Sequence, residues 1–220
     1  MVKKACLVML AGCLVWCWTA PVGAQGDKPA GAPPAEKPVA AAAETQKAVP
    51  EIPKDKQTTL GLYVTAKEAY DMWQKDQQKV KIIDIRPPER YALIGHAPMA
   101  VNIPARFTTY AWDEKKKDYA LKPNPNFVTE VQKRFAKDDT ILVMCRSGQG
   151  SAPPVDLLAK AGFTKVYNIT DGFEGDMIND PQSPNHGKRM KNGWKIFNLP
   201  WTYDLDVNLM YLPEGKPKAE

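Results

Sequence analysis

Apolar and polar positions follow two different patterns along residues 58–176. Short β-branched runs, at residues 80–85, 101–104, 140–144 and 165–169, are typical of strands that are buried on both faces of a parallel sheet. Segments between these runs carry apolar residues at helical spacing. Because strand and helix patterns alternate, we predict an α/β fold in which helices cover both faces of a central, mainly parallel sheet.

Capping signals mark where three helices begin. Residues 65–68 form a capping box ahead of the first helix, and the second helix begins at Asn124 or Asn126. The third follows Ser151 and carries two prolines in its first turn, where a missing N–H costs little. It ends before Gly162, a common residue type just past a helix end.

Segments outside these elements differ in composition. Residues 25–57 are rich in Pro and Ala and poor in bulky apolar side chains, so we expect a disordered linker there. Residues 107–122 are interpreted as a polar connection that forms a rim to a site. The aromatic side chains of the extension 177–220 are too numerous to leave in water. We expect this extension to pack on the domain, and the alternative is a docking site for another periplasmic protein.

Residues 1–24 have the layout of a secretory signal peptide. Two lysines precede an apolar run at residues 5–18, and small residues stand before Gln25. The run is short for a membrane span. A second interpretation stays open, because residues 10–13 resemble a bacterial lipobox in which Cys13 would be lipidated. We therefore expect a periplasmic or secreted protein or, alternatively, a lipoprotein that meets the membrane only through Cys13.

Charge and motif content exclude several function classes. The formal net charge is +5, and without the two lysines of the leader 28 basic residues stand against 25 acidic ones, a net charge of +3 that is too small to indicate a nucleic-acid partner. The sequence has no haem-attachment motif, no paired-cysteine redox motif, no zinc-ligand cluster and no Gly-rich nucleotide loop. We therefore expect neither a cofactor nor a metal ion.

Cys145 is the candidate reactive residue. The other three cysteines lie within residues 1–24, so after export Cys145 has no internal disulfide partner. It follows the strand at 140–144 and precedes small residues and the start of a helix. Loop amides, the helix N-terminus and Arg146 would stabilise a thiolate in this place. The alternative is that Cys145 is only a small buried hydrophobe at a strand end.

Three sequence segments carry a resemblance to a known family. The segment "CRSGQGS" is preceded by "DIRPPERYALIGHAPMAVNIP" and followed by "LLAKAGFTKVYNITDGFEG". In this order and spacing they resemble a single-domain rhodanese, or thiosulfate sulfurtransferase, over about residues 60–175. The resemblance implies a rhodanese domain at residues 58–176, in which Cys145 carries a persulfide sulfur from a donor to a nucleophilic acceptor. The expected anion-binding loop consists of Arg146, Ser147, Gly148, Gln149, Gly150 and Ser151.

Gly150 departs from the pattern of the resembling family, whose loop commonly ends in Arg before the Ser. An arginine would provide a forked donor and a positive charge for an anionic substrate. We therefore expect weak use of thiosulfate, better use of polysulfide, and stronger thiosulfate binding in a Gly150→Arg variant. Asp84 and Arg86 are interpreted as an intradomain ion pair or loop anchor. The functional alternative is that they border the pocket, because the resemblance places them close to the active loop. His96 is interpreted as structural rather than as a catalytic base.

Two functional hypotheses follow. In the first, the protein is an enzyme that moves sulfur from thiosulfate or polysulfide to cyanide or a thiol through Cys145. In the second, it holds a persulfide for a periplasmic redox or sulfur-metabolism partner and turns over little by itself. A phosphatase or arsenate reductase would need Arg six positions after the cysteine, where this chain has Ser151.

Overall fold

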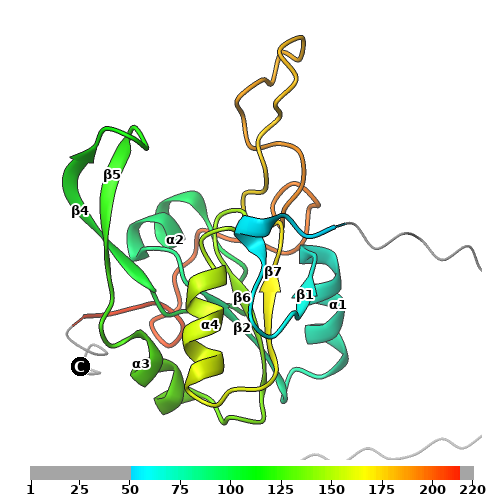
Figure 1. Cartoon of the computed structure of the whole chain (residues 1–220). Helices are drawn as coiled ribbons and strands as arrows, with labels where there is room; N and C mark the ends of the chain where they lie inside the picture. Colours follow the sequence, from blue (N-terminus) through cyan, green and yellow to red (C-terminus); the bar gives the residue numbers. More distant parts are fainter. Residues whose placement is uncertain (1–50, 214–220) are drawn as a thin grey trace, which may run out of the picture. The chain divides into compact units, whose positions relative to one another are not determined.

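Five parallel strands form the central sheet, in the order β1-β7-β6-β2-β3 (Figure 1). The structure is a computed structural model and describes residues 51–213. The predicted α/β class with a mainly parallel sheet is confirmed. The elements, in chain order, are a 3-10 helix η1 (Lys54–Lys56), β1 (Tyr63–Val64), α1 (Ala66–Lys75), β2 (Val80–Asp84), α2 (Pro88–Ile94), β3 (Val101–Asn102), β4 (Arg106–Asp113), β5 (Asp118–Pro123), α3 (Phe127–Arg134), β6 (Thr140–Met144), α4 (Ala152–Lys160) and β7 (Val166–Ile169).

The neighbouring interior strands β2 and β6 are buried on both faces, as their apolar runs predict. They pair in parallel register from Val80 with Thr140 to Asp84 with Met144. Side chains of successive residues point to opposite faces, so each strand contributes to both cores. Because the two strands run in the same direction, the residues that follow them meet at one edge of the sheet.

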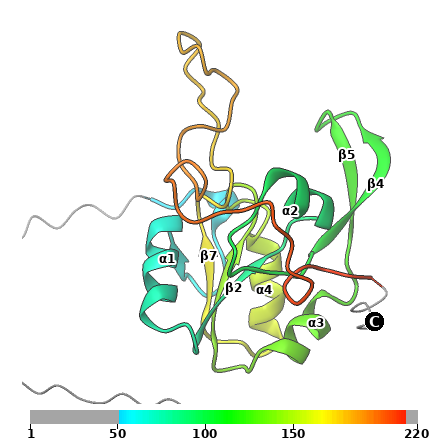
Figure 2. The same cartoon turned by 180° about the vertical axis from the view of Figure 1, so that it is seen from behind.

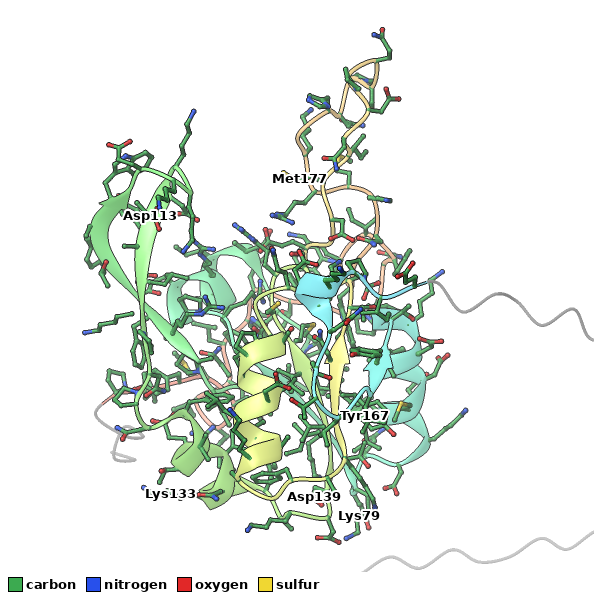
Figure 3. The ribbon with its side chains drawn as sticks, viewed as in Figure 1. Lys79, Asp113, Lys133, Asp139, Tyr167 and Met177 are labelled. Carbon is green, nitrogen blue, oxygen red and sulfur yellow. The ribbon has the colours of Figure 1, made fainter. Side chains whose placement is uncertain are left out.

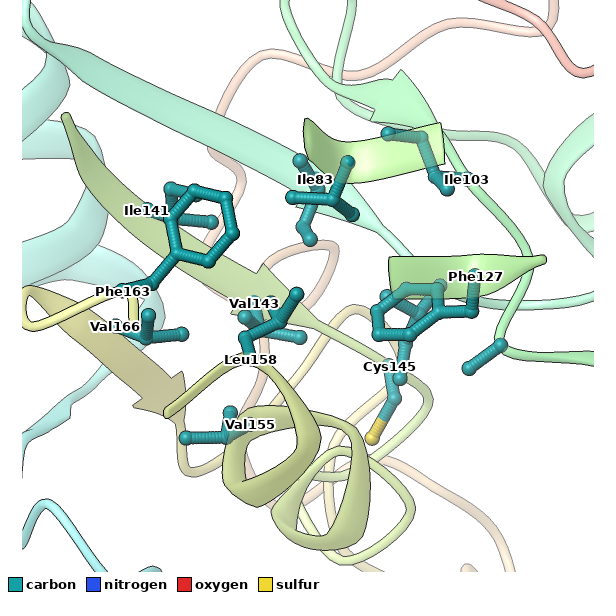
Figure 4. Close-up of a cluster of buried hydrophobic side chains, with 13 residues drawn as sticks. Ile83, Ile103, Phe127, Ile141, Val143, Cys145, Val155, Leu158, Phe163 and Val166 are labelled. Carbon is teal, nitrogen blue, oxygen red and sulfur yellow. The ribbon is translucent and has the colours of Figure 1, made fainter. Parts of the chain in front are cut away.

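Each face of the sheet has its own apolar core. One core packs under α3 and α4 and is drawn in Figure 4. It contains Ile83, Ile85, Ile103, Ala105, Phe127, Val131, Ile141, Val143, Cys145, Val155, Leu158, Phe163 and Val166. The other core packs under α1 and the C-terminal extension. It contains Val64, Ala66, Ala69, Val80, Ile82, Ala97, Ala100, Leu142, Met144, Ile169, Phe173 and Trp194.

Helix ends follow the capping signals in part. At α1, Glu68 N–H donates to Thr65 Oγ1 and Thr65 N–H donates to Glu68 Oε2, which confirms the capping box. Helix α3 begins after Asn126, although no side chain caps it. Ser151 is the N-cap residue of α4 by position, but its side chain makes no capping hydrogen bond. Its hydroxyl instead lies within hydrogen-bond distance of Cys145 Sγ, Gly148 O and Asn168 Oδ1.

The structure contains an antiparallel hairpin and a helix that the sequence patterns did not predict. Residues 107–122, interpreted as a polar connection that forms a rim to a site, belong to the β4–β5 hairpin, and several of them line the pocket described below. Much of the hairpin is solvent-exposed, so it lacks the continuous apolar run that marks the buried strands. The seven-residue helix α2 is too short for a periodic pattern. Pro88, in the first turn of α2, is the one nearby residue that indicates a helix start.

Residues 51–57 correct the predicted boundary of the linker. The helix η1 lies here, and Lys56 is buried, with its Nζ 2.8 Å from Asp176 Oδ1. Composition could not reveal this contact, because the two residues are far apart in the sequence. The predicted signal peptide with Cys13, linker residues 25–50 and extension residues 214–220 lie outside the described residues.

The C-terminal extension lies against the α1 side of the sheet (Figure 2). Trp194 is fully buried there, and its Nε1 donates to the Pro200 carbonyl at 2.8 Å. Further along, Thr202 exchanges two backbone hydrogen bonds with His96, and Asn102 N–H donates to Leu209 O. The extension therefore covers backbone at the edge strand β3, an edge that would otherwise be open to pairing.

None of the helices within residues 51–213 has the length and apolar character needed to cross a membrane.

Candidate active site

Cys145 follows β6 directly, so the sheet delivers its thiol to the carboxyl edge. Cys145 is 6% exposed, and its side chain lies at the border of the core under α3 and α4, beside Phe127 (Figure 4). Its Sγ accepts a hydrogen bond from the Gly148 N–H at 3.2 Å. A backbone donor aimed at the sulfur favours negative charge on Sγ.

A buried polar network holds the far side of the loop. The Ser151 Oγ lies 3.2 Å from Cys145 Sγ, 3.1 Å from Gly148 O and 2.6 Å from Asn168 Oδ1, and its single proton can be donated to one of these three atoms. Asn168 Nδ2 in turn donates to the carbonyl oxygens of Gly148 and Lys56, each at 2.9 Å. Sequence reasoning missed Asn168, because a polar residue inside a strand pattern is not by itself a functional signal.

The turn after β7 supports the Cys145 loop through its backbone. Phe173 N–H donates to Cys145 O, and Glu174 N–H donates to Arg146 O, both at 2.9 Å. Gly172 has a φ of +62°, and a Cβ there would lie 2.6 Å from Cys145 O. Only a residue without a side chain allows the two backbones to approach this closely.

Asp171 begins this turn and provides a prediction about stability. Its Oδ1 accepts a hydrogen bond from Ala66 N–H at 2.7 Å, at the start of α1. Burial outweighs the neighbouring donors and raises the pKa of Asp171 to about 6. A folded-state pKa above the unfolded value means that this group stabilises the fold at low pH, and that the contribution is lost as pH rises through about 6.

Asp171→Asn should therefore remove part of the pH dependence of folding. The decrease in unfolding free energy between pH 4.5 and pH 7.5 should become smaller by about 2 kcal/mol. Urea unfolding at both pH values measures this difference. Asp71→Asn, at an exposed position of α1, is the matched control and should leave the slope unchanged. An Asp171→Asn variant with the slope of the original protein would contradict the role of this carboxyl group.

A pocket of about 790 Å³ opens over Cys145. The Cys145 loop, the start of α2, the β4–β5 hairpin and the loop after Gly175 form its walls. The hairpin and that loop both extend beyond the carboxyl edge of the sheet (Figure 1), and Figure 3 shows Asp113 on the one and Met177 on the other. The charged lining residues are Arg86, Arg90, Arg106, Lys116, Lys117, Arg146, Arg189 and, as the one carboxylate, Asp118. This charge balance favours an anionic ligand.

Asp118 partly neutralises two of these arginines. Its Oδ2 lies 2.6 Å from Arg90 Nη2 and 3.9 Å from Arg146 Nη1. Burial acts to raise the pKa of Asp118, but the hydrogen bond and charge of Arg90, together with the charge of Arg146, hold it below the usual value. The predicted loop residue Arg146 is thus at the pocket, with a side chain that is 42% exposed.

Asp84 and Arg86 form a buried ion pair at the end of β2. Arg86 donates from Nε to Asp84 Oδ1 at 3.0 Å and from Nη2 to Asp84 Oδ2 at 2.6 Å. The guanidinium also lies over the Phe173 ring, 4.2 Å from its centroid. Arg86 lines the pocket and Asp84 does not, so Asp84 acts on the pocket by positioning Arg86.

The remaining loop residues have different surroundings. Ser147 is buried and lines the pocket. Gln149 also lines the pocket, and its Nε2 donates to Asp55 Oδ2 at 2.8 Å. His96 lies outside the pocket lining: its ring stacks on Tyr91 with centroids 3.8 Å apart, and burial lowers the pKa of His96.

The side chain of Arg106 lies beside Gly150, in the pocket. Arg106 is the first residue of β4, and its Nη2 donates to the Gly150 carbonyl at 2.9 Å. A Cβ on Gly150 would lie 3.1 Å from that Nη2 and 3.6 Å from Cys145 Sγ. The guanidinium of Arg106 therefore occupies space that a side chain at position 150 would need. The stronger thiosulfate binding predicted for Gly150→Arg assumed that this space is free, and Arg106 occupies it.

Arg189 is a pocket residue that sequence reasoning missed. It lies in the polar, Gly- and Pro-punctuated segment after the predicted domain, and its Nη1 donates to Gly175 O at 2.6 Å. Burial, and then the positive charge of Arg146, lower the pKa of Arg189, while the charges of Glu174, Asp176 and Cys145 act in the opposite direction. No local pattern in the segment indicates that it returns to the cysteine.

Within residues 51–213, His, Cys, Asp and Glu side chains form no group of three or more that is arranged to hold a metal ion.

Comparisons with known proteins point to one family. The family model of the rhodanese-like domain matches residues 65–177, more than half of the chain. Chloroplastic thiosulfate sulfurtransferase 16 of Arabidopsis thaliana is 32% identical over 93 residues, which are 42% of this chain and 70% of that protein. A senescence-associated protein of Raphanus sativus is 32% identical over 97 residues, 44% of this chain and 48% of that protein. The chain thus spans about half the length of the first of the curated relatives it matches.

A crystal structure of a protein from M. tuberculosis is similar over 64% of this chain and 96% of that one. The two are 23% identical, and the TM-score is 0.48.

Proposed function

The chain belongs to the rhodanese-like domain family, and on that premise we propose that it is a sulfurtransferase whose carrier is a persulfide on Cys145. Membership in this family, which includes a named thiosulfate sulfurtransferase, supports a role in sulfur transfer. The observation that carries the proposal is the position of Cys145 Sγ: it faces a loop N–H donor at the base of a strongly cationic pocket.

The proposed loading step is a thiolate displacement. The Cys145 thiolate attacks the outer sulfur of thiosulfate, a bond forms between the two sulfur atoms, and the sulfur–sulfur bond of thiosulfate breaks. The electron pair of that bond leaves with sulfite, so no external oxidant or reductant is required. Polysulfide loads the same thiolate in the same way, with a shorter polysulfide as the leaving group.

The unloading step reverses the roles. Cyanide or an ionised thiol attacks the outer persulfide sulfur, which leaves with the acceptor as thiocyanate or as a new persulfide, and Cys145 is released as a thiolate. The Gly148 N–H and the Ser151 hydroxyl can both donate to Sγ while it carries negative charge. Because the leaving thiolate is already stabilised in this way, the cycle needs no side-chain general base, which agrees with the position of His96 outside the pocket.

Export is part of the proposal. The leader-like residues 1–24 support a periplasmic or secreted location, or a lipid anchor at Cys13. In that compartment the acceptor would be a small thiol or a periplasmic protein thiol.

Mass spectrometry of the full chain tests this function. After treatment with thiosulfate or polysulfide, the peptide that contains Cys145 should gain about 32 Da, the mass of one sulfur transferred to the thiolate. Protein alkylated at Cys145 beforehand is the control and should gain none. Failure of every donor to load unmodified protein would contradict the proposal.

The same preparation separates an enzyme from a carrier. With excess donor and cyanide, an enzyme forms many equivalents of thiocyanate for each protein molecule. A carrier that depends on a partner would load sulfur and release at most one equivalent.

A further inference from the structure

We propose that Arg106, from the hairpin, is the residue that binds the anionic end of the sulfur donor beside Cys145. The inference rests on the proposed sulfur transfer and names a specificity-determining residue for it. Arg106 lies outside the cysteine loop and outside every segment in which the sequence patterns located site residues. Because its side chain lies beside Gly150, Arg106 brings a charged group of the hairpin close to the reactive sulfur.

Distance is the first argument. The Arg106 Nη2 and the Cys145 Sγ both lie within 4 Å of the point that a Cβ on Gly150 would occupy. A small sulfur oxyanion that places its outer sulfur at Sγ therefore has its charged oxygen atoms within reach of this guanidinium. The bond from Nη2 to Gly150 O uses one of the five N–H donors of the side chain.

Charge is the second argument. Among the arginines that line the pocket, Arg86 is paired with Asp84, and Arg90 is paired with Asp118. Arg146 lies 3.9 Å from Asp118, and within residues 51–213 neither Arg106 nor Arg189 forms an ion pair with a carboxylate. Of these two, Arg106 is the one whose Nη2 lies beside Gly150 and Cys145. A guanidinium whose charge is not neutralised by the protein is the stronger site for an incoming anion.

The loop sequence is the third argument. Glycine at position 150 leaves open the space in which the guanidinium lies, and its backbone φ is outside the positive range that would itself require glycine. Gly150 therefore has a steric role here: it admits an arginine from β4. An arginine introduced at position 150 of the otherwise unchanged protein would compete with Arg106 for this space rather than add a second binding group.

A double-mutant cycle tests the inference. Arg106→Ala should raise the KM for thiosulfate by roughly ten- to a hundredfold, the loss that follows from a charged hydrogen bond. Gly150→Arg alone should bring no improvement, because its side chain meets Arg106. The double variant should recover at least about tenfold of the loss, since the new arginine then has the space to itself. Lys122→Ala, on β5 and outside the pocket lining, is the control and should leave KM unchanged.

A neutral organic trisulfide, which also carries sulfane sulfur, distinguishes binding from loop positioning. The Cys145 thiolate attacks its central sulfur and releases one alkyl thiolate, and an added thiol then removes the other alkylthio group as a disulfide and leaves the Cys145 persulfide. If Arg106 binds the anion, Arg106→Ala loads from the trisulfide at a rate within about twofold of the original protein. Equal losses with both donors would show that the residue only holds the loop through Gly150 O, and would overturn the inference. An unchanged KM for thiosulfate would overturn it as well, while sulfur transfer through Cys145 would stand.

Arg106→Gln provides a second variant if the alanine variant does not fold. It keeps an N–H donor and removes the charge, so it should show the same selective loss with thiosulfate. Failure of the original protein to load from either donor would contradict the proposed function instead.

Discussion

Cys145→Ser should abolish both the formation of the persulfide adduct and the transfer of sulfur to any acceptor. A serine hydroxyl is not ionised near neutral pH and cannot form the sulfur–sulfur bond on which the proposed cycle depends. The change removes little volume, and a hydroxyl can still accept from the Gly148 N–H, so the loop should keep its conformation. The expected result is loss of at least about a thousandfold in transfer rate at nearly unchanged stability.

Two measurements make this prediction decisive. Peptide mapping of the variant after exposure to polysulfide would show whether sulfur is carried at another position, including the cysteines of residues 1–24. Urea unfolding would show that the variant is folded, so that loss of transfer reflects the missing thiol. Transfer at the original rate in a folded Cys145→Ser protein would exclude Cys145 as the carrier.

Gly148→Ala is expected to have the second large effect, and it acts on the fold as well as on the site. Gly148 has a φ of +82°, and a Cβ there would overlap the carbonyl group of Thr170. Thr170 lies in the backbone turn after β7 that supports the cysteine loop, so it cannot move aside without disturbing that loop. We expect a loss of about 2 to 4 kcal/mol in unfolding free energy, from the strained backbone and the overlap together.

Gly187→Ala is the matched control for this substitution. Gly187 also has a positive φ, +75°, but nothing lies within 4 Å of the place where its Cβ would be. The loss of unfolding free energy in Gly187→Ala therefore measures the backbone strain alone. The additional loss in Gly148→Ala measures the overlap with Thr170. Persulfide loading should be lost only in Gly148→Ala, because only that change moves the N–H that faces Sγ. Equal stabilities of the two variants would contradict the close approach.

The central part of the fold was predictable from sequence because its signals are local. The buried run at residues 140–144, the capping box at Thr65 and the two prolines after Ser151 each act within a few residues of the chain. The β4–β5 hairpin carries no comparable signal, since its side chains are mostly exposed and its strands pair outside the main sheet.

The pocket residues also fall into two groups: those close to Cys145 in the sequence, which could be predicted, and those far from it, which could not. The residues from Arg146 to Ser151 follow Cys145 in sequence, so the motif brings them to the site. Arg106 and Arg189 reach the pocket through the hairpin and through the loop after Gly175, and nothing near either residue in sequence specifies those paths. Lys56 and Asp176 were missed for the same reason.

The C-terminal extension affects the order in which the parts of the pocket are completed during synthesis. Met177 and Arg189 line the pocket, and Trp194 is buried against the sheet face beyond them. A ribosome makes the cysteine loop well before it makes these residues. A nascent chain that has reached only the end of the sheet therefore presents its thiol without the last wall of the pocket. Synthesis of the extension, rather than of the cysteine motif, is the step that completes the site.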